Sequence, residues 1–137
     1  MMDFSGIISI ATAGLKVQTK RMEVISENIA NSDSTASTPG GDPYRRKVPV
    51  FRVVVEPQSQ QTTVVFAGVK RDPRAFGTKV DPGNPAADAT GTVKIPNIDP
   101  QVEQMDMRDA QLSYEANLNS ISATRRLLSR TIDILRA

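Results

Sequence analysis

Three acidic residues, Glu103, Asp106 and Asp109, are spaced three apart near the start of the last third of the chain. Carboxylates at this spacing share one face of a helix, where they could act in acid–base catalysis or bind a metal ion. The chain has no His and no Cys, which removes the commonest general base, the commonest metal ligand and all thiolate chemistry. The same carboxylates suit the positive end of a helix dipole. We therefore expect no catalytic residue, no metal site and no cofactor.

A second cluster is basic and consists of Arg45, Arg46 and Lys47. Residues 34–98 carry nine basic and five acidic residues, whereas residues 1–33 and 99–137 each have one more acidic than basic residue. Such a cluster is usually a solvated face; alternatively it contacts acidic groups of a neighbouring molecule through weak exposed ion pairs. No aromatic platform or nucleic-acid motif accompanies it, and Gly40-Gly41 lacks the Lys-Ser/Thr context of a phosphate loop. We therefore expect no nucleic-acid binding.

Asparagine amides form a third group. Asn31 follows an apolar-periodic stretch, and the simplest interpretation is a left-handed helix C-cap. The alternative is that Asn28, Asn31, Asn117 and Asn119 hydrogen-bond between subunits and fix their register, as a polar residue in an apolar seam can.

The element that must position the first amides is a long helix over residues 4–29. Alternating steps of four and three from Phe4 give eight positions, of which seven are apolar and only Gln18 is polar. This is the pattern of a coiled-coil seam. The eight positions are Phe4, Ile8, Ala11, Leu15, Gln18, Met22, Ile25 and Ile29.

A second long helix is predicted from residue 100 to 135. Large side chains recur every seven residues at Met107, Tyr114, Ile121, Leu128 and Leu135, and the positions between them are small or polar. Asp99-Pro100 suits an N-cap followed by Pro at the first helical position. A stripe that alternates large and small side chains favours close approach to neighbouring helices.

Between the helices the periodicity changes to that of short strands. Apolar and β-branched runs at 48–55, 62–66 and 92–95 are separated by Gly and Pro, and seven of the nine prolines lie between residues 43 and 96. This predicts three to five short antiparallel strands, with a turn at residues 81–85. The expected fold class is α+β: terminal helices at 1–33 and 99–137 packed as a coiled-coil-like layer, with a small β domain at 34–98.

The apolar stripes indicate that the chain is a subunit of a helical assembly. Burying one Leu, Ile or Met side chain stabilises by roughly 1.5–3 kcal/mol, and a two-helix hairpin covers only one side of each helix. We therefore expect neighbouring chains to complete the burial, and a free monomer to be less helical than two full helices require. Ile7, Ile8 and Ile10 lack the preceding basic residues of a secretory signal, and no stretch is apolar enough to span a bilayer.

Several sequence blocks occur in an order typical of a known family. These blocks, which cover nearly the whole chain, are Ala13-Gly14-Leu15, Arg21, Asn28-Ile29-Ala30-Asn31, Tyr44-Arg45-Arg46-Lys47, Val50-Phe51, Asp81-Pro82-Gly83-Asn84-Pro85-Ala86-Ala87-Asp88, Gly91-Thr92-Val93, Pro96-Asn97-Ile98, Glu103-Gln104-Met105-Asp106-Met107, Ala110 and Ser113-Tyr114-Glu115-Ala116-Asn117. They resemble the rod and hook axial proteins of the bacterial flagellum, and the block from Asp81 to Ile98 is similar to the proximal rod proteins of the basal body. The chain departs from them at Asn84, where the family usually has His, and at Thr92, where an aromatic residue is common.

The resemblance implies a non-enzymatic structural subunit of the proximal rod, the hollow drive shaft that crosses the periplasm and transmits torque. The implied partners are other rod subunits, copies of the chain itself, the protein that joins the rod to the MS ring, and the flagellar type III apparatus, which would export the chain without a cleaved Sec signal and without membrane insertion. The residues expected at subunit interfaces are Phe4, Ile8, Leu15, Met22, Ile25, Asn28, Ile29, Asn31, Met107, Tyr114, Asn117, Ile121, Leu128, Ile132 and Leu135.

Two alternatives remain open at the level of sequence. The chain could be a different axial rod or hook subunit, because Asn-Ile-Ala-Asn is shared among them. From another class, it could be a soluble adaptor whose helix hairpin docks on a partner while the basic segment binds an anionic surface. Salt-dependent binding to anionic lipid or DNA would favour the adaptor.

Overall fold

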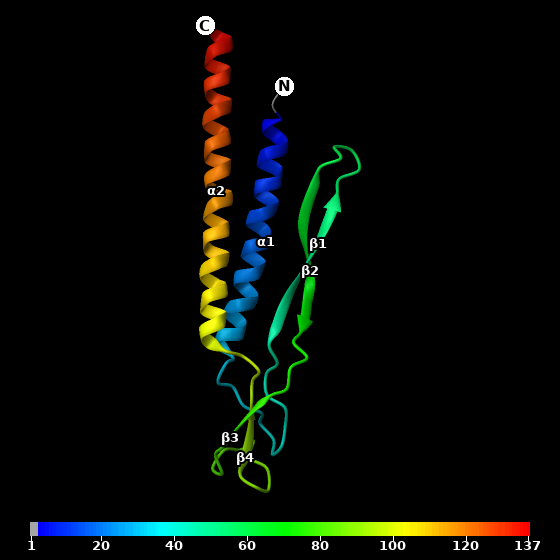
Figure 1. The fold of residues 1–137 in the computed structure, drawn as a ribbon, viewed down its shortest axis with the longest axis vertical. Coiled ribbons are helices and arrows are strands. Elements are labelled where there is room, and N and C mark those ends of the chain that lie inside the picture. Colours follow the sequence, from blue (N-terminus) through cyan, green and yellow to red (C-terminus); the bar gives the residue numbers. More distant parts are fainter. Residues whose placement is uncertain (1–2) are drawn as a thin grey trace. The chain divides into compact units, whose positions relative to one another are not determined.

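The computed structural model describes residues 3–137. Two long helices lie at the ends of the sequence, and four strands lie between them (Figure 1). In chain order the elements are α1 (Phe4–Ala30), β1 (Lys47–Val55), β2 (Thr62–Arg71), β3 (Gly77–Val80), β4 (Thr92–Ile95) and α2 (Pro100–Arg136). The predicted α+β class is confirmed, and both helices end within a residue or so of their predicted limits.

Each helix begins at an aspartate that caps its first turn. Asp99 Oδ1 accepts a hydrogen bond from the backbone N–H of Gln101 at 3.0 Å, which confirms the predicted cap of α2. Asp3 Oδ1 accepts the N–H of Gly6 at 2.8 Å, a cap of α1 that the sequence analysis did not predict. Both carboxylates satisfy backbone donors that have no partner within the helix.

The end of α1 differs from the prediction. Among the described residues the only non-glycine residue with positive φ is Gln60, so the left-handed conformation predicted for Asn31 is wrong. The side-chain amide of Asn31 instead donates to the carbonyl oxygen of Glu27 at 2.8 Å. The same carbonyl also accepts the backbone N–H of Asn31 at 3.2 Å, so the helical hydrogen-bond pattern reaches Asn31 without an αL residue.

The strands form two separate two-stranded sheets. β1 and β2 are joined by a short turn in which the N–H of Glu56 donates to the carbonyl of Gln61 at 2.8 Å. β3 and β4 are antiparallel and pair from Gly77 with Ile95 to Val80 with Thr92. The predicted turn lies between β3 and β4, where the N–H of Asn84 donates to the Asp81 carbonyl at 3.1 Å. β2 runs further than predicted and reaches Arg71.

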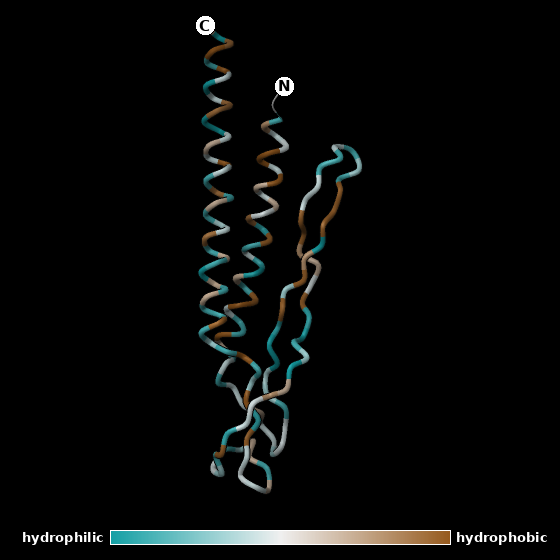
Figure 2. The backbone as a smooth tube through the Cα atoms, viewed as in Figure 1, coloured by the Kyte–Doolittle hydropathy of each residue, from teal (hydrophilic) through white to brown (hydrophobic). Residues whose placement is uncertain are grey.

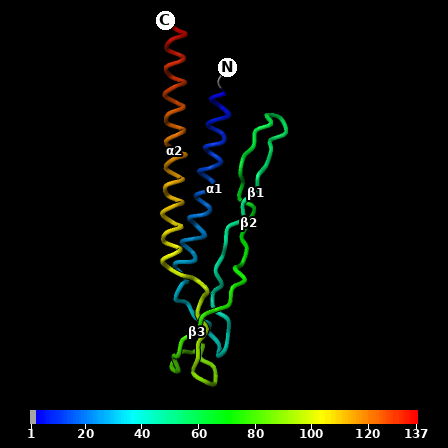
Figure 3. The backbone as a smooth tube through the Cα atoms, in the orientation of Figure 1, coloured from blue at the N-terminus to red at the C-terminus, as the bar shows by residue number. Residues whose placement is uncertain are grey.

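The chain divides into two compact units, each made of separate stretches of sequence. The first unit takes the chain up to Met22, together with Val50–Gly68 and Arg108–Ala137; the second takes Glu23–Pro49 and Val69–Met107. Figure 3 follows both helices and the β1–β2 hairpin along the chain. The predicted domain limits at residues 33 and 98 stay a prediction.

In the first unit α1 and α2 pack antiparallel, and the unit also contains most of the β1–β2 hairpin. Ala11 and Val17 of α1 and Ala110 and Ile121 of α2 are buried, and Phe51 and Phe66 meet edge to face across the hairpin, with ring centres 6.2 Å apart. Figure 2 shows apolar residues recurring along both helices. The buried residues are mostly small, which allows close approach and leaves many larger apolar side chains only partly covered.

The second unit has a small apolar core. Val24 and Ile25 at the end of α1, Val93 of β4 and Ala86 in the preceding loop are its buried apolar residues. Three charged or polar side chains, Asn28, Asp72 and Glu103, are buried in the same unit. Burying such groups is costly unless they are hydrogen-bonded, so their partners define the first candidate site.

Candidate functional site

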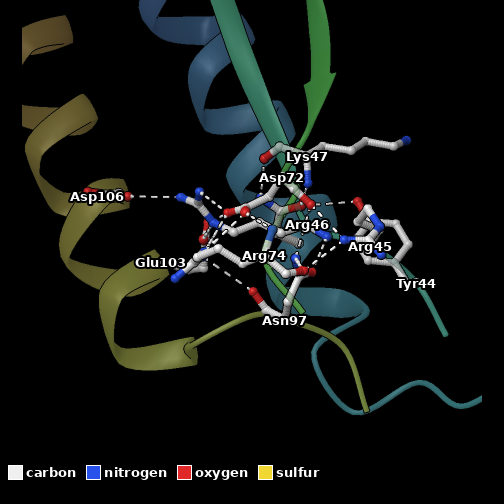
Figure 4. Close-up of polar contacts among 10 residues, drawn as sticks. Tyr44, Arg45, Arg46, Lys47, Asp72, Arg74, Asn97, Glu103 and Asp106 are labelled. Atoms are coloured by element: carbon white, nitrogen blue, oxygen red, sulfur yellow. Dashed lines mark hydrogen bonds and ion pairs between the residues drawn. The ribbon is translucent and has the colours of Figure 1, made fainter. Parts of the chain in front are cut away.

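A buried polar cluster connects four segments of the second unit (Figure 4). We define it by Asn28 of α1, Arg46 just before β1, Asp72 just after β2 and Glu103 in the first turn of α2. Asn28 and Glu103 are each only 1% exposed, and Asp72 is 6% exposed. Consecutive members of the cluster are 18 to 31 positions apart in sequence, so only the tertiary fold brings them together.

Asn28 uses both ends of its amide within the chain. Nδ2 donates to the carbonyl of Lys47 at 2.8 Å and to Glu103 Oε2 at 3.3 Å. Oδ1 accepts the backbone N–H of Lys47 at 2.9 Å and the hydroxyl of Tyr44 at 3.1 Å. The side chain therefore pairs with the start of β1 much as a neighbouring strand would. Asn28 was predicted to lie at a subunit interface; the structure gives it a role inside its own chain.

Arg46 is the cation at the centre of the cluster. Its Nε donates to Glu103 Oε1, and its Nη1 donates to Asp72 Oδ2 at 3.3 Å. Nη2 lies 3.6 Å from Asp106 Oδ2. Burial alone would lower the pKa of Arg46, but the hydrogen bonds and charges of Glu103 and Asp72 outweigh it and raise that pKa. Arg46 is therefore firmly protonated and paired.

Asp72 is held from one side by Arg74 and from the other by Arg46. Arg74 donates to Asp72 through Nε at 3.0 Å, through Nη2 at 2.7 Å and through its backbone N–H at 3.0 Å. These bonds, led by the Arg74 side chain, hold the pKa of Asp72 well below its usual range despite its burial. Asn97 adds a tie by donating to the Asp72 carbonyl at 3.2 Å.

Arg45 and Lys47, the basic residues on either side of Arg46, also contact their own chain. Arg45 donates through Nη1 to the carbonyls of Asp72 and Arg74, each at 2.8 Å, and Lys47 pairs with Glu27. Burial, together with the charges of Glu27 and Glu103, raises the pKa of Tyr44 to about 12, so its hydroxyl stays a donor. The expectation of a solvated face is wrong for Arg46, and the acidic groups that it contacts belong to the same chain.

The three carboxylates on α2 have partners that the sequence analysis missed. Glu103 and Asp106 contact Arg46, and Asp109 contacts Arg21 Nη2 at 3.1 Å within the first unit. The helix-dipole interpretation did not anticipate these contacts. The presence of acidic residues on α2 and basic residues in other segments indicated that ion pairs could form. It did not indicate which acidic residue would pair with which basic residue.

In the first unit, some of the predicted heptad positions lie between α1 and α2. Phe4, Ile8 and Leu128 line one shallow hollow, and Gly14 lies against the amide of Asn117, whose Nδ2 donates back to the Ser113 carbonyl at 2.9 Å. Gln18, the polar seam residue, has a buried Oε1 with no hydrogen-bond partner among the described residues.

The remaining predicted interface residues differ in exposure. Ile25 and Ile121 are buried, whereas Ile132 is 40% and Leu135 is 80% exposed. The partly buried ones are Leu15, Met22, Ile29, Asn31, Met107 and Tyr114. Whether any of these residues also contacts another subunit stays a prediction.

A second apolar face of α2 was missed. Leu112, Leu127 and Ile134 are 60%, 48% and 74% exposed. At 3.6 residues per turn they lie on one side of the helix, turned away from the side that carries Ala110 and Ile121. We call these three residues the outer face of α2. The spacing of seven between Leu127 and Ile134 was a signal, but a stronger repeat on the same helix masked it. We call that repeat the inner stripe; its residues are Met107, Tyr114, Ile121, Leu128 and Leu135.

Residues 3–137 offer no group of three or more acidic side chains placed to hold a metal ion. Within the same part of the chain, neither helix is long and apolar enough to cross a membrane.

Comparisons with known proteins identify the family of the chain. A family model described as flagella basal body rod protein matches residues 8–36. The flagellar basal-body rod protein FlgC of Agrobacterium fabrum is 47% identical over 133 residues, which is 97% of this chain and 96% of that protein. The proteins of the same name from Aquifex aeolicus and Yersinia enterocolitica are 38% and 36% identical, each over 97% of this chain and 98% of their own length. The chain belongs to the FlgC family of flagellar basal-body rod proteins.

Proposed function

We propose that the chain assembles into the rod through its terminal helices, with the outer face of α2 packed against neighbouring subunits. Membership of the family makes the chain a non-enzymatic, structural subunit of the flagellar basal-body rod, which assembles with other basal-body components. The proposal concerns how it does so. In this arrangement the inner stripe holds α1 and α2 together within a chain, and the outer face joins one chain to the next.

The exposure of the outer face carries this proposal. Three large aliphatic side chains lie on one side of α2, and each is about half or more exposed. Covering one such side chain stabilises by roughly 1.5–3 kcal/mol, and large apolar side chains that recur along one side of an exposed helix suit contact with a neighbouring chain. Met105, seven residues before Leu112 on the same helix, is 71% exposed and extends the pattern.

The ends of the helices support the same assembly. α2 continues to Arg136, eight residues past Leu128, which is the last α2 residue in the hollow with Phe4 and Ile8. Ile132 and Leu135 in this last stretch continue the inner stripe but remain exposed. We propose that they, with the other predicted interface residues at the helix ends, contact a second subunit of the rod.

The finer partners follow from the resemblance to rod subunits. We propose that the chain contributes to the part of the rod that spans the periplasm, that it contacts the protein joining the rod to the MS ring, and that the flagellar type III apparatus exports it without a cleaved signal. An incompletely covered helix layer supports this, because such a layer is easy to unfold before assembly and gains its stability on packing.

The test replaces Leu112 and Leu127 together by Gln in cells that depend on this chain for motility. We expect at least a tenfold loss of assembled rods in electron micrographs and the loss of swimming, because two apolar contacts worth roughly 3–6 kcal/mol in total are removed. The matched control is Ser122→Gln, an exposed position of α2 away from the outer face. Normal rods in the double variant at normal protein level would contradict the proposal.

A further inference from the structure

A small basic pocket opens beside the buried polar cluster, entirely within the second unit. Its volume is about 220 Å³, and it lies between the segment before β1 and the end of β2. We call it the Arg45 pocket. Its lining residues are Asp42, Pro43, Tyr44, Arg45, Lys47, Arg71 and Phe76.

The guanidinium of Arg45 is fixed in this pocket. Nη1 donates to two backbone carbonyls, those of Asp72 and Arg74, each at 2.8 Å. The same guanidinium lies over the ring of Phe76, with its central carbon 4.2 Å from the ring centre. Its Nε and Nη2 groups have no hydrogen-bond partner among residues 3–137. A guanidinium oriented in this way presents free N–H donors without needing to reorganise.

Arg71 brings a second cation to the pocket. It is the last residue of β2 and is exposed, and within the described part of the chain its side chain has no hydrogen bond or ion pair. The other charged lining residues are compensated: Lys47 by Glu27, and Asp42 by Lys94 at 3.0 Å. The pocket therefore holds two guanidinium charges that the chain itself does not balance.

We propose that the Arg45 pocket binds one carboxylate side chain of a neighbouring rod subunit. Arginine forks match the two oxygens of a carboxylate, and the subunits of a rod are surrounded by other polypeptide chains. Asp42 also lines the pocket, and its negative charge makes the pocket less suited to a doubly charged phosphate than to a single carboxylate. The inference rests on the proposed function for the source of the carboxylate; the anion site itself rests on the geometry of Arg45 and Arg71.

The first experiment compares Arg71→Ala with Arg52→Ala in cells that depend on this chain. Arg52 is a matched control, because it is an exposed arginine of β1 outside the pocket. We expect Arg71→Ala to reduce the number of assembled rods several-fold, Arg71→Lys to reduce it less, and Arg52→Ala to leave it unchanged. Equal rod numbers in Arg71→Ala and Arg52→Ala would overturn the proposal.

The second experiment measures binding to the purified full chain at constant ionic strength. The probes are N-acetylglutamate and inorganic phosphate, and the readout is the Nε–H resonance of Arg45. We expect a saturable shift with N-acetylglutamate, at least as strong as with phosphate, and about tenfold weaker binding in Arg71→Ala, the loss expected for one charge-assisted hydrogen bond. No saturable shift, or tighter binding of phosphate, would overturn the assignment.

The two proposals fail separately. If the outer-face variant assembles normally while Arg71→Ala does not, the helix proposal falls and the pocket stands. If the outer-face variant blocks assembly while Arg71→Ala behaves like Arg52→Ala, the pocket falls and the helix proposal stands.

Discussion

In the second unit, the buried polar cluster is almost fully enclosed, and each of its four side chains is hydrogen-bonded to its own chain. In the first unit, the outer face of α2 leaves large apolar side chains in water. The stability of the cluster depends on the directions and lengths of its hydrogen bonds, since a buried ion pair stabilises only where its geometry is good. The stabilisation that the outer face can gain depends only on how much of its apolar area a neighbour covers. One region thus sets the geometry of the chain, and the other leaves surface for neighbours.

Because of this difference, residues of the same type have different structural roles in the two units. Asn28 and Asn117 are both helical asparagines. Asn28 joins three segments of the second unit, whereas the side-chain hydrogen bond of Asn117 within residues 3–137 goes to its own helix. Substitutions in the cluster should therefore lower the stability of a single chain. Substitutions on the outer face should spare the single chain and impair assembly.

The largest effect is expected from Glu103→Ala. This change leaves the partly buried Arg46 without its closest carboxylate, with only Asp72 and Asp106 remaining. Removing one partner of a buried ion pair costs up to about 3–5 kcal/mol. Amide hydrogen exchange of β3 and β4 in the purified chain reports the stability of the second unit. We expect the protection of these amides to fall strongly.

The control for this prediction is Glu115→Ala, which removes an exposed glutamate from the same helix. It should change the free energy of unfolding by no more than about 0.5 kcal/mol. Equal losses in the two variants would show that the cluster does not determine the stability of the second unit.

A smaller effect is expected from acid, through Asp72. The pKa of this carboxyl is lowered in the folded chain from its ordinary value of 3.8, first by the side-chain bonds from Arg74. A lowered folded pKa means that the stabilisation is complete above pH 3.8 and is lost as the pH falls towards the folded pKa. The stability of the second unit should therefore decline as the pH drops below about 4.

The matched variant is Asp72→Asn, which cannot titrate at this position. At neutral pH it should be less stable by about 1–3 kcal/mol, because charge-assisted hydrogen bonds are lost. The gap between the wild-type chain and the variant should narrow as the pH falls from 4 to 2, measured by urea unfolding. A gap that stays constant over this range would disprove the assigned role of Asp72.

The smallest effect is expected at the seam of the first unit. A Cβ on Gly14 would lie 2.6 Å from Asn117 Oδ1 and 2.8 Å from its Nδ2. Gly14→Ala gains up to about 1 kcal/mol of helix propensity, but the overlap costs about 1–3 kcal/mol, so thermal unfolding should shift down slightly. Adding Asn117→Ala should reverse the shift. A higher unfolding temperature in Gly14→Ala alone would contradict the close approach of the helices.

The parts of the fold that could be predicted from the sequence are those that the local spacing of apolar residues determines. Heptad spacing from Phe4 and from Met107 was enough to place both helices, and Gly and Pro punctuation was enough to place most of the strands. β3 was not predicted, because all four residues of Gly77–Val80 are exposed and the strand has no apolar alternation. The left-handed conformation predicted for Asn31 was wrong: its backbone N–H and its side-chain amide both donate to the Glu27 carbonyl, at 3.2 and 2.8 Å.

The buried polar cluster was beyond sequence reasoning for a different reason. Arg46 and Glu103 were both noticed, but each had a sufficient local explanation, one as a solvated charge and the other as a partner of the helix dipole. Their contact joins residues 57 positions apart, and no spacing rule connects such a pair. The outer face of α2 was missed because exposure depends on which side of the helix α1 covers.

The long separations within the cluster also fix the order in which a growing chain can complete it. A polypeptide leaves the ribosome N-terminus first, and Glu103 follows Asn28 by 75 residues. Until that glutamate appears, Asn28 and Arg46 have only water in its place, and closing so long a loop is slow. An interrupted chain that lacks its last third therefore stays loose around Arg46, so only a nearly finished molecule can acquire the rigid geometry described above.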